Sequence, residues 1–250
     1  MTNQVIQPEA VLPNDLEYSV VVPVYNEGAN IGALCRTAKA QLPGKYELLI
    51  CYDFDGDNTL SALAALAEDD KPAGLRLVKN LLGRGVRYAI DAGMRAAAAP
   101  VVIVTMADLS DDFSAIREMV ARAQAGADVV SGSRYMKGGQ QIGGPKIKGA
   151  LSRVAGLTLY WFTGLPTHDP TNSFKAYRRE FLLRTPIESE AGFCLGLELT
   201  VKAHFSGSRV EEVPATWQDR TAGESRFKLL KWMPMYLHWY FYAFRRRWIG

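Results

Sequence analysis

The sequence predicts an α/β fold, in which helices flank a mostly parallel, Rossmann-like sheet. Short apolar segments rich in β-branched residues alternate along the chain with segments of helical periodicity, as in successive strand–helix units. Polar residues follow the strand segments, at the end where an open α/β sheet binds its ligands. With 250 residues, of which 48% are hydrophobic, the chain can bury a substantial core.

The first part of the chain carries two strand–helix units in succession. A β-rich segment at 18–26 precedes helical spacing at 30–42, and the apolar segment 46–58 precedes an Ala- and Leu-rich helix between Leu60 and Glu68. Because consecutive units of this kind place their strands side by side in one direction, they favour a parallel sheet.

Further strands are expected at 74–80, 101–108 and 128–135, with helices at 86–99 and 113–126 between them. The carboxyl ends of parallel strands meet at one edge of the sheet, so the polar residues there are expected to line one crevice. These residues are Asn26, Glu27, Asp53, Asp55, Asn80, Asp108, Ser133 and Arg134.

The pattern loosens after Tyr135. Segment 136–149 is rich in Gly and Lys, which is typical of a mobile functional loop or a disordered linker, and a helix is expected at 150–162. The start of the chain lacks the basic and apolar regions of a signal peptide. The expected parts are a flexible leader at 1–17, a folded domain at 18–228 and a C-terminal segment at 229–250.

Charge and cysteine content restrict the function classes. The net charge of +3 is too small to indicate a nucleic-acid partner, and none is expected. The three cysteines show no C-x-x-C spacing, which argues against a disulfide framework and against a zinc site. A reducing compartment, and therefore a cytoplasmic location, fits this cysteine usage best.

The C-terminal segment combines aromatic, apolar and basic residues and has no Asp or Glu from Arg226 onward. It is shorter than the roughly 20 apolar residues that span a bilayer, and Pro234 is expected to break or kink a helix there. We expect amphipathic interfacial helices in peripheral contact with a membrane, with Arg245 to Arg247 on anionic lipid. The alternative is a helix packed on the domain itself or on a partner subunit, and exposed aromatic residues make a homo-oligomer possible.

Six motifs together resemble the family 2 glycosyltransferases of the GT-A fold. They are "VVPVYNE", "YDFDGDNT", "MADLS", "GSRY", "DPTNSFKAYRRE" and "EEVPATWQDRTAGESRFK", and they extend from Tyr18 to Lys228. The later motifs resemble the branch of dolichol-phosphate mannosyltransferases and polyprenyl-phosphate glycosyltransferases. The resemblance implies an inverting enzyme that moves a sugar from a nucleotide-sugar donor to a polyprenyl or dolichyl phosphate at the cytoplasmic face of a membrane.

The resemblance implies a nucleotide pocket at the first two strand ends. Asp53 falls at the base-contacting aspartate of the family, although the usual D-D-G-S reads Tyr52-Asp53-Phe54-Asp55 here. The alternative is that these acids form a turn and cap a helix. The residues expected to line the pocket are Pro23, Tyr25, Glu27, Asp53 and Asp55.

Donor phosphates are expected to meet the glycine-rich turn before the helix at 86–99. Arg84 can contact a diphosphate there, and Arg87, which replaces a glycine of the family pattern, either contacts the ligand or is solvated. Arg220, Ser225 and Lys228 resemble a loop that covers donor phosphates, with a plain surface loop as the alternative.

The metal motif of the family, D-x-D, is half present. Met106 occupies the first position, and its thioether is a poor ligand for Mg²⁺ or Mn²⁺. Asp108 would hold the ion together with Ser110 or Asp112, the nucleotide phosphates and water. The alternative is a metal-free or inactive site.

The acceptor residues follow from the motifs "GSRY" and "KIKGALSR". Arg134 lies at the acceptor-phosphate arginine of the family, and Lys148 and Ser152 lie one helical turn apart, where relatives have a basic residue and a serine. Lys148 replaces an arginine, which retains the charge but loses the bidentate fork. The alternative is a basic loop that leads into an amphipathic helix.

A phosphate acceptor simplifies the expected chemistry. A phosphomonoester is already an anion at neutral pH, so Asp108, Arg134, Lys148 and Ser152 suffice as the catalytic set and no general base is needed. A saccharide or protein hydroxyl acceptor would need a base, for which Asp169 or Glu198 is the candidate. A third possibility is a protein that binds nucleotide sugars without catalysis.

Overall fold

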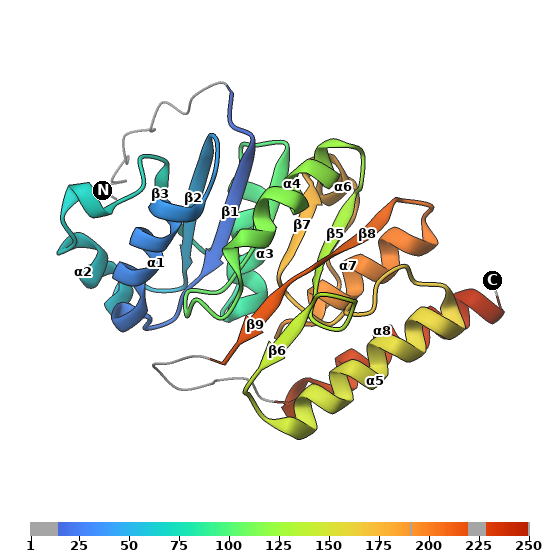
Figure 1. The fold of residues 1–250 in the computed structure, drawn as a ribbon. Coiled ribbons are helices and arrows are strands. Elements are labelled where there is room, and N and C mark those ends of the chain that lie inside the picture. Colours follow the sequence, from blue (N-terminus) through green and yellow to red (C-terminus); the bar gives the residue numbers. More distant parts are fainter. Residues whose placement is uncertain (1–14, 191, 220–228, 250) are drawn as a thin grey trace, which may run out of the picture.

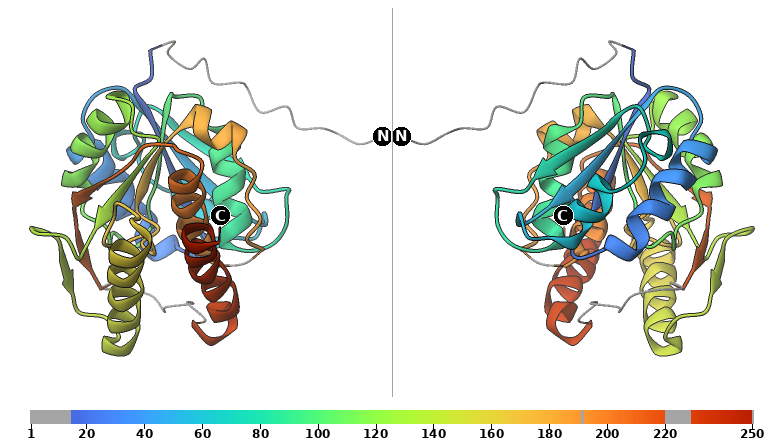
Figure 2. Two further views of the ribbon diagram at one scale, coloured as in Figure 1. Left: turned by 90° about the vertical axis from the view of Figure 1, so that its right-hand side faces the viewer. Right: turned by 90° about the vertical axis from the view of Figure 1, so that its left-hand side faces the viewer.

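The computed structural model describes residues 15–190, 192–219 and 229–249. A seven-stranded sheet with the order β3-β2-β1-β4-β7-β5-β8 forms its centre, and helices cover both faces (Figures 1 and 2). The predicted α/β class is therefore confirmed. The strands of this sheet are β1 (Tyr18–Pro23), β2 (Tyr46–Tyr52), β3 (Leu75–Lys79), β4 (Val101–Val104), β5 (Val129–Ser133), β7 (Lys175–Arg178) and β8 (Val210–Pro214).

The helices fall close to their predicted positions in the first half of the chain. They are α1 (Gly28–Gln41), α2 (Asn58–Ala64), α3 (Val86–Ala96), α4 (Ile116–Gln124), α5 (Lys146–Thr163), α6 (Arg179–Arg184), α7 (Cys194–Phe205) and α8 (Leu229–Trp248). A second, two-stranded sheet consists of β6 (Gln140–Ile142) and β9 (Thr216–Gln218).

The parallel centre of the sheet is buried on both faces. All six residues of β1 are buried, as expected for a strand that helices cover on both sides. Ile31 and Leu34 of α1 belong to the core on one face, and Ile90 and Met94 of α3 belong to the core on the other. This burial fixes β1, β2 and β4 in one register, and it brings their carboxyl ends to one edge.

Strand β7 is antiparallel and lies between β4 and β5. Its first residue, Lys175, pairs with Val104 at the end of β4 and with Ser131 in β5. The amino end of β7 therefore lies at the same edge as the carboxyl ends of its neighbours. The sequence analysis did not predict this strand.

Segment 136–149 is more ordered than the expected mobile loop or linker. It contains β6, which pairs with β9, and helix α5 begins at Lys146 rather than at 150. Strand β9 also bonds to the loop after β4, because the Asp112 amide donates to the Thr216 carbonyl at 3.1 Å and the Gln218 amide donates to the Ser110 carbonyl at 2.9 Å. These long-range pairs could not be recognised from local pattern.

Helices α5 and α8 run side by side below the sheet in Figure 1. Trp239 and Ala243 of α8 are buried against Leu159 of α5 and Leu197 of α7, so one face of α8 packs on the domain. Of the expected break or kink at Pro234, the break does not occur: α8 continues through Pro234, which lies in the second turn and removes one backbone donor. None of the helices in the described part of the chain is long and apolar enough to cross a membrane.

Close packing of α3 on the sheet predicts the effect of a single methyl group. A Cβ atom at Gly93 would lie 2.4 Å from Val21 Cγ1 and 2.6 Å from Cys51 Sγ. We expect Gly93→Ala to lower the free energy of unfolding by about 1–3 kcal/mol in urea titrations. Gly32→Ala in α1 is the control, because its nearest neighbours lie at 3.5 Å and helix propensity predicts a gain of about 0.5–1 kcal/mol. Equal stability of Gly93→Ala and the natural protein would contradict this packing.

Candidate active site

The first two strand ends are joined by a shared aspartate. The Asp57 carboxylate accepts hydrogen bonds from the Asn26 amide at 3.0 Å and from the Thr59 amide at 2.9 Å, so it caps α2 and also fixes the turn after β1. Asn26 adopts a φ of 55°, which this contact stabilises. The predicted pocket residues Tyr25 and Glu27 therefore lie on a turn that is held next to the turn after β2, and Pro23 is the buried last residue of β1. The helix-capping alternative applies to Asp57.

Asp53 connects the second strand end to the third. Its carboxylate accepts from Asn80 Nδ2 at 2.7 Å and from the Gly85 amide at 2.7 Å. These bonds hold the turn that carries Arg84, and they place the turn at the amino end of α3, which favours anions. Asp53 thus shares a pocket edge with Arg84.

Asp55 points toward β3 rather than toward Asp53 and Arg84. Its side chain is 74% exposed and pairs with Lys79 at 2.6 Å, toward the β3 edge of the sheet. Beside it, the rings of Tyr25 and Phe54 lie 5.5 Å apart and form an aromatic rim at the first two strand ends. Phe54, which replaces a glycine of the family motif, therefore contributes to the pocket edge.

Both expectations for Arg87 are wrong, because its side chain is neither solvated nor directed at the ligand edge. The side chain is buried, and it donates to the carbonyls of Ser189 at 2.7 Å and Ile187 at 2.9 Å. It also pairs with Asp91 at 3.1 Å. Arg87 thus joins α3 to the segment before α7, a tertiary contact that the sequence pattern did not reveal.

The loop after β4 carries a half-buried carboxylate, Asp108, and a buried one, Asp111. Asp108 is half-buried, and its Oδ1 accepts from the Ser110 amide at 3.1 Å. Asp111, 6% exposed, accepts from Thr105 Oγ1 at 2.9 Å and from the Met106 amide at 3.4 Å. Burial, together with the charge of Asp108, raises the pKa of Asp111 to about 7, and the hydrogen bond from Thr105 offsets part of this rise.

Asp112, the acid next to Asp111, has a different role. Its carboxylate accepts from the Ser114 amide at 2.9 Å and caps the short helix that follows. Asp112 thus serves as a helix cap, and Asp111, which was not among the predicted site residues, is the buried acid of this loop. Two adjacent acids in a loop give no periodicity from which to tell the inward one.

The donor set of this loop suits a hard divalent cation. Asp108, Ser110 and Asp111 offer carboxylate and hydroxyl oxygens, the ligands that Mg²⁺ and Mn²⁺ prefer, whereas Met106 packs against the apolar core. No group of three or more His, Cys, Asp or Glu in the described residues is arranged to hold a metal ion. Asp108, Ser110 and Asp111 alone would leave coordination positions of such an ion for phosphates and water.

The acceptor residues form a compact group that we call the Arg134 cluster: Arg134, Ser152, Asp169 and Thr171. Arg134 Nε and Nη2 donate to the two oxygens of Asp169 at 2.6 and 2.9 Å. Nη2 also donates to Ser152 Oγ at 3.0 Å, and this hydroxyl lies 2.5 Å from Thr171 Oγ1. Lys148 lies one turn before Ser152 on α5 and is half-buried. Thr171 is a functional candidate that the sequence analysis did not single out.

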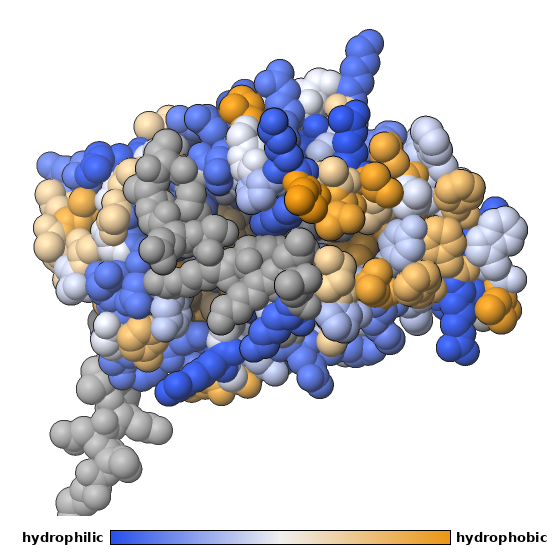
Figure 3. Space-filling view, turned by 90° about the horizontal axis from the view of Figure 1, so that it is seen from below, coloured by the Kyte–Doolittle hydropathy of each residue, from blue (hydrophilic) through white to orange (hydrophobic). Residues whose placement is uncertain are grey.

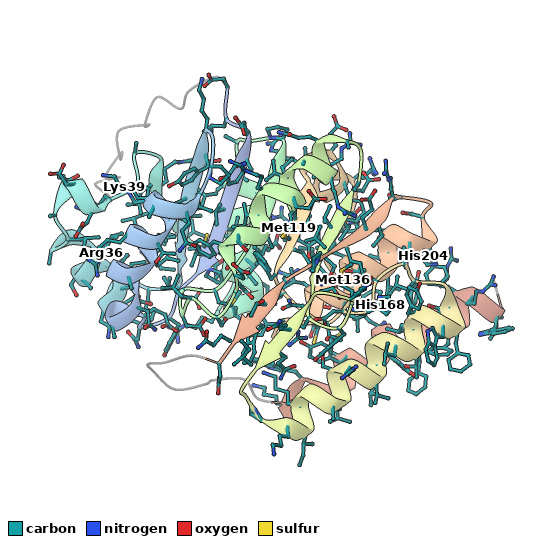
Figure 4. The ribbon with its side chains drawn as sticks, viewed as in Figure 1. Arg36, Lys39, Met119, Met136, His168 and His204 are labelled. Carbon is teal, nitrogen blue, oxygen red and sulfur yellow. The ribbon has the colours of Figure 1, made fainter. Side chains whose placement is uncertain are left out.

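Arg134 remains charged in this environment. Its side chain is 11% exposed, and burial lowers the pKa of its guanidinium, but the charge and hydrogen bonds of Asp169 outweigh burial and raise it above the ordinary value. Nearby, the His168 ring stacks on Tyr160 of α5 with centroids 4.0 Å apart, and Figure 4 shows His168 beside α5. A fixed positive charge therefore lies where α5 meets the sheet.

Asp169 and Glu198, the candidate general bases for a hydroxyl acceptor, both accept hydrogen bonds from other parts of the protein. Asp169 gives both oxygens to Arg134. Glu198 is buried and accepts from the amides of Glu188 and Ser189 at 2.6 and 2.8 Å and from Lys202 Nζ at 2.7 Å. Neither carboxylate is placed to take a proton from a hydroxyl acceptor. The predicted donor-loop residues Arg220, Ser225 and Lys228 lie outside the described residues.

Two proteins of known name are similar to this chain in sequence. Polyprenol monophosphomannose synthase of Mycolicibacterium smegmatis is 30% identical over 228 residues, which cover 85% of each protein. Dolichol-phosphate mannosyltransferase of Pyrococcus furiosus is 29% identical over 218 residues, which cover 85% of this chain and 60% of that protein.

The fold has solved counterparts. Glucosyl-3-phosphoglycerate synthase of Mycobacterium tuberculosis, in complex with Mn²⁺, uridine diphosphate and glucosyl-3-phosphoglycerate, superposes with a TM-score of 0.65 at 18% identity, over 92% of this chain and 79% of that one. Residues 19–184 match the family model described as glycosyl transferase family 2. The protein therefore has the GT-A fold and belongs to glycosyl transferase family 2.

Proposed function

We propose that the protein is an inverting glycosyltransferase that moves one sugar from a nucleotide-sugar donor to a polyprenyl or dolichyl phosphate. The observation that carries this proposal is the Arg134 cluster. It presents a permanently charged, nearly buried guanidinium beside two hydroxyl groups, which is a suitable environment for a phosphate monoester. The names of the two relatives above, a synthase of polyprenol monophosphomannose and a dolichol-phosphate mannosyltransferase, support the same acceptor class.

The acceptor phosphate needs positioning rather than deprotonation. Arg134, Lys148 and Ser152 would orient one phosphate oxygen toward the anomeric carbon of the donor, and the engaged state of Asp169 and Glu198 agrees with a reaction that uses no general base. One displacement of this kind inverts the anomeric configuration. A saccharide or protein hydroxyl acceptor has no comparable support among the described side chains.

The donor would lie across the first four strand ends. Pro23, Tyr25, Glu27 and Asp53 would contact the nucleoside, and Arg84 with the amino end of α3 would face the diphosphate. Asp108, Ser110 and Asp111 would hold a divalent cation together with that diphosphate. When bound, Mg²⁺ or Mn²⁺ neutralises the charge that grows on the leaving group. Arg220 and Lys228 are proposed to contact the donor phosphates.

We also propose peripheral contact with the cytoplasmic face of a membrane, through a surface that we call the α5–α8 face. On α5, exposed apolar side chains recur at helical spacing, and on α8 further ones extend toward Arg245–Arg247. In Figure 3 hydrophobic side chains gather on the right, over these helices. The exposed residues are Ile147, Leu151, Val154, Trp161, Leu237, Phe241 and Trp248. A lipid acceptor would reach Ser152 along this face.

Loss of the Arg134 guanidinium should selectively weaken binding of the acceptor. With a panel of nucleotide sugars, Mg²⁺ and polyprenyl phosphate in detergent, we expect Arg134→Gln to raise the acceptor KM by roughly 30-fold, equivalent to about 2 kcal/mol for charged hydrogen bonds. Arg117→Gln, on an exposed part of α4 far from the strand ends, is the control. Glycolipid formation is followed by mass spectrometry. An unchanged acceptor KM in folded Arg134→Gln would sink the proposed acceptor site.

The two neighbouring aspartates of the β4 loop allow a matched test of the metal site. Calorimetry should show that Asp108→Asn weakens Mn²⁺-dependent binding of a nucleoside diphosphate by about tenfold, the order of one charge-assisted contact. Asp112→Asn, which alters only the helix cap, should leave that binding unchanged. Equal effects of the two substitutions would show that Asp108 is not a ligand.

The α5–α8 face predicts binding to anionic vesicles. Trp161 is 71% exposed and Phe241 is 61% exposed, so Trp161→Ser together with Phe241→Ser should reduce co-sedimentation with phosphatidylglycerol vesicles by tenfold or more, roughly 1.5 kcal/mol or more of apolar contact. Leu183→Ser, on an equally exposed position of α6, is the control. Vesicle binding that survives the double substitution would place the membrane contact elsewhere.

A further inference from the structure

Lys175, the first residue of β7, is a fully buried lysine that lies beside the carboxyl ends of β4 and β5. Its Nζ donates to the backbone carbonyl of Asn172 and, at 3.4 Å, to that of Asp169. Within the described residues it forms no ion pair, although Asp169 and Asp111 lie near enough for their charges to act on it. The ammonium group is therefore satisfied by backbone rather than by a carboxylate.

Burial of this ammonium group costs desolvation free energy. Burial and the charge of Arg134 lower the pKa of Lys175, the charges of Asp169, Asp111 and Glu212 offset part of this effect, and the resulting pKa is about 7. An apolar side chain of similar length would fill the same space without this desolvation cost. What the lysine provides, and an apolar side chain cannot, is two hydrogen bonds to the ends of one short turn.

That turn, 169–172, supplies half of the Arg134 cluster. The Asp169 carboxylate holds the Arg134 guanidinium, and Thr171 Oγ1 contacts Ser152. The turn is further anchored to β5, because Ser131 Oγ donates to the Asp169 carbonyl at 2.9 Å and Asn172 Nδ2 donates to the Gly132 carbonyl at 2.8 Å. Lys175 bonds to both ends of the turn between these anchors.

We propose that Lys175 is a positioning residue for the acceptor phosphate: it fixes turn 169–172, so that Asp169 and Thr171 hold Arg134 and Ser152 in the geometry that receives the acceptor. This rests on the proposed function, because the role is defined by the lipid-phosphate acceptor. The antiparallel direction of β7 makes it possible, since it alone brings the amino end of a strand between the carboxyl ends of β4 and β5.

The kinetic test separates acceptor from donor. Lys175→Met should raise the KM for polyprenyl phosphate by roughly tenfold, the order of one lost hydrogen-bond contact, while the donor KM stays within twofold. Lys175→Arg, which restores donors to the turn carbonyls, should recover part of the acceptor affinity. Lys202→Met is the matched control, since it removes another largely buried lysine, on α7, and should lower stability without changing the acceptor KM.

A second measurement does not depend on turnover. Hydrogen exchange in Lys175→Met should accelerate at amides of 169–174 and at the Arg134 amide, which donates to Asp169, but not around α3. An unchanged acceptor KM, an equal rise in both KM values, or exchange identical to that of the natural protein would each overturn the proposal. If the natural protein itself transfers no sugar to lipid phosphates, the proposed function fails instead, and that result is seen before any variant is compared.

Discussion

The buried ion pair between Arg134 and Asp169 is the interaction on which the acceptor side of this protein depends. Asp169 is fully buried and accepts from the Arg134 backbone amide as well as from two guanidinium nitrogens. Each charge would be strongly unfavourable without the other, so the pair fixes both side chains. Since Arg134 follows β5 and Asp169 precedes β7, the pair joins two distant parts of the chain, and the hydrogen bond from Arg134 to Ser152 adds α5 as a third.

The proposed donor side is organised by hydrogen bonds to backbone amides rather than by an ion pair. Asp57 joins the first two turns, Asp53 joins the second to the third, and β9 holds the loop of Asp108. Carboxylates at the strand ends therefore act first as ligands for backbone amides, which preorganises the crevice before any substrate enters. Preorganised charges and dipoles are effective in catalysis because they need no rearrangement during the reaction.

Much of the fold follows from local pattern. The five strands β1 to β5 and the helices between them have the apolar periodicity and the breaks that the sequence predicts, because their burial is continuous along each segment. Strands β6, β7 and β9 are short, and their partners are distant in sequence, so no local signal marks them. The helix predicted at 150–162 begins earlier in the structure, at Lys146, because the segment before it forms β6 rather than a loop.

The site was predictable in its parts and not in its contacts. Arg134 and Ser152 were chosen from motifs, and the structure places them in one hydrogen-bonded group. Arg87 was misread because its partners are carbonyls a hundred residues away, and Asp111 was missed because two adjacent acids in a loop give no periodicity that tells which one is buried. Side-chain direction in loops is set by tertiary contacts, which composition and spacing do not encode.

The central claim is that the Arg134 cluster receives a phosphate and that no side chain deprotonates the acceptor. The most direct measurement compares polyprenyl phosphate with the polyprenol of the same chain length as acceptors for the purified protein, with identical donor, metal and detergent. The account predicts transfer to the phosphate and none above background to the alcohol. Comparable transfer to the alcohol would contradict it, because a hydroxyl acceptor requires the general base that neither Asp169 nor Glu198 is placed to provide.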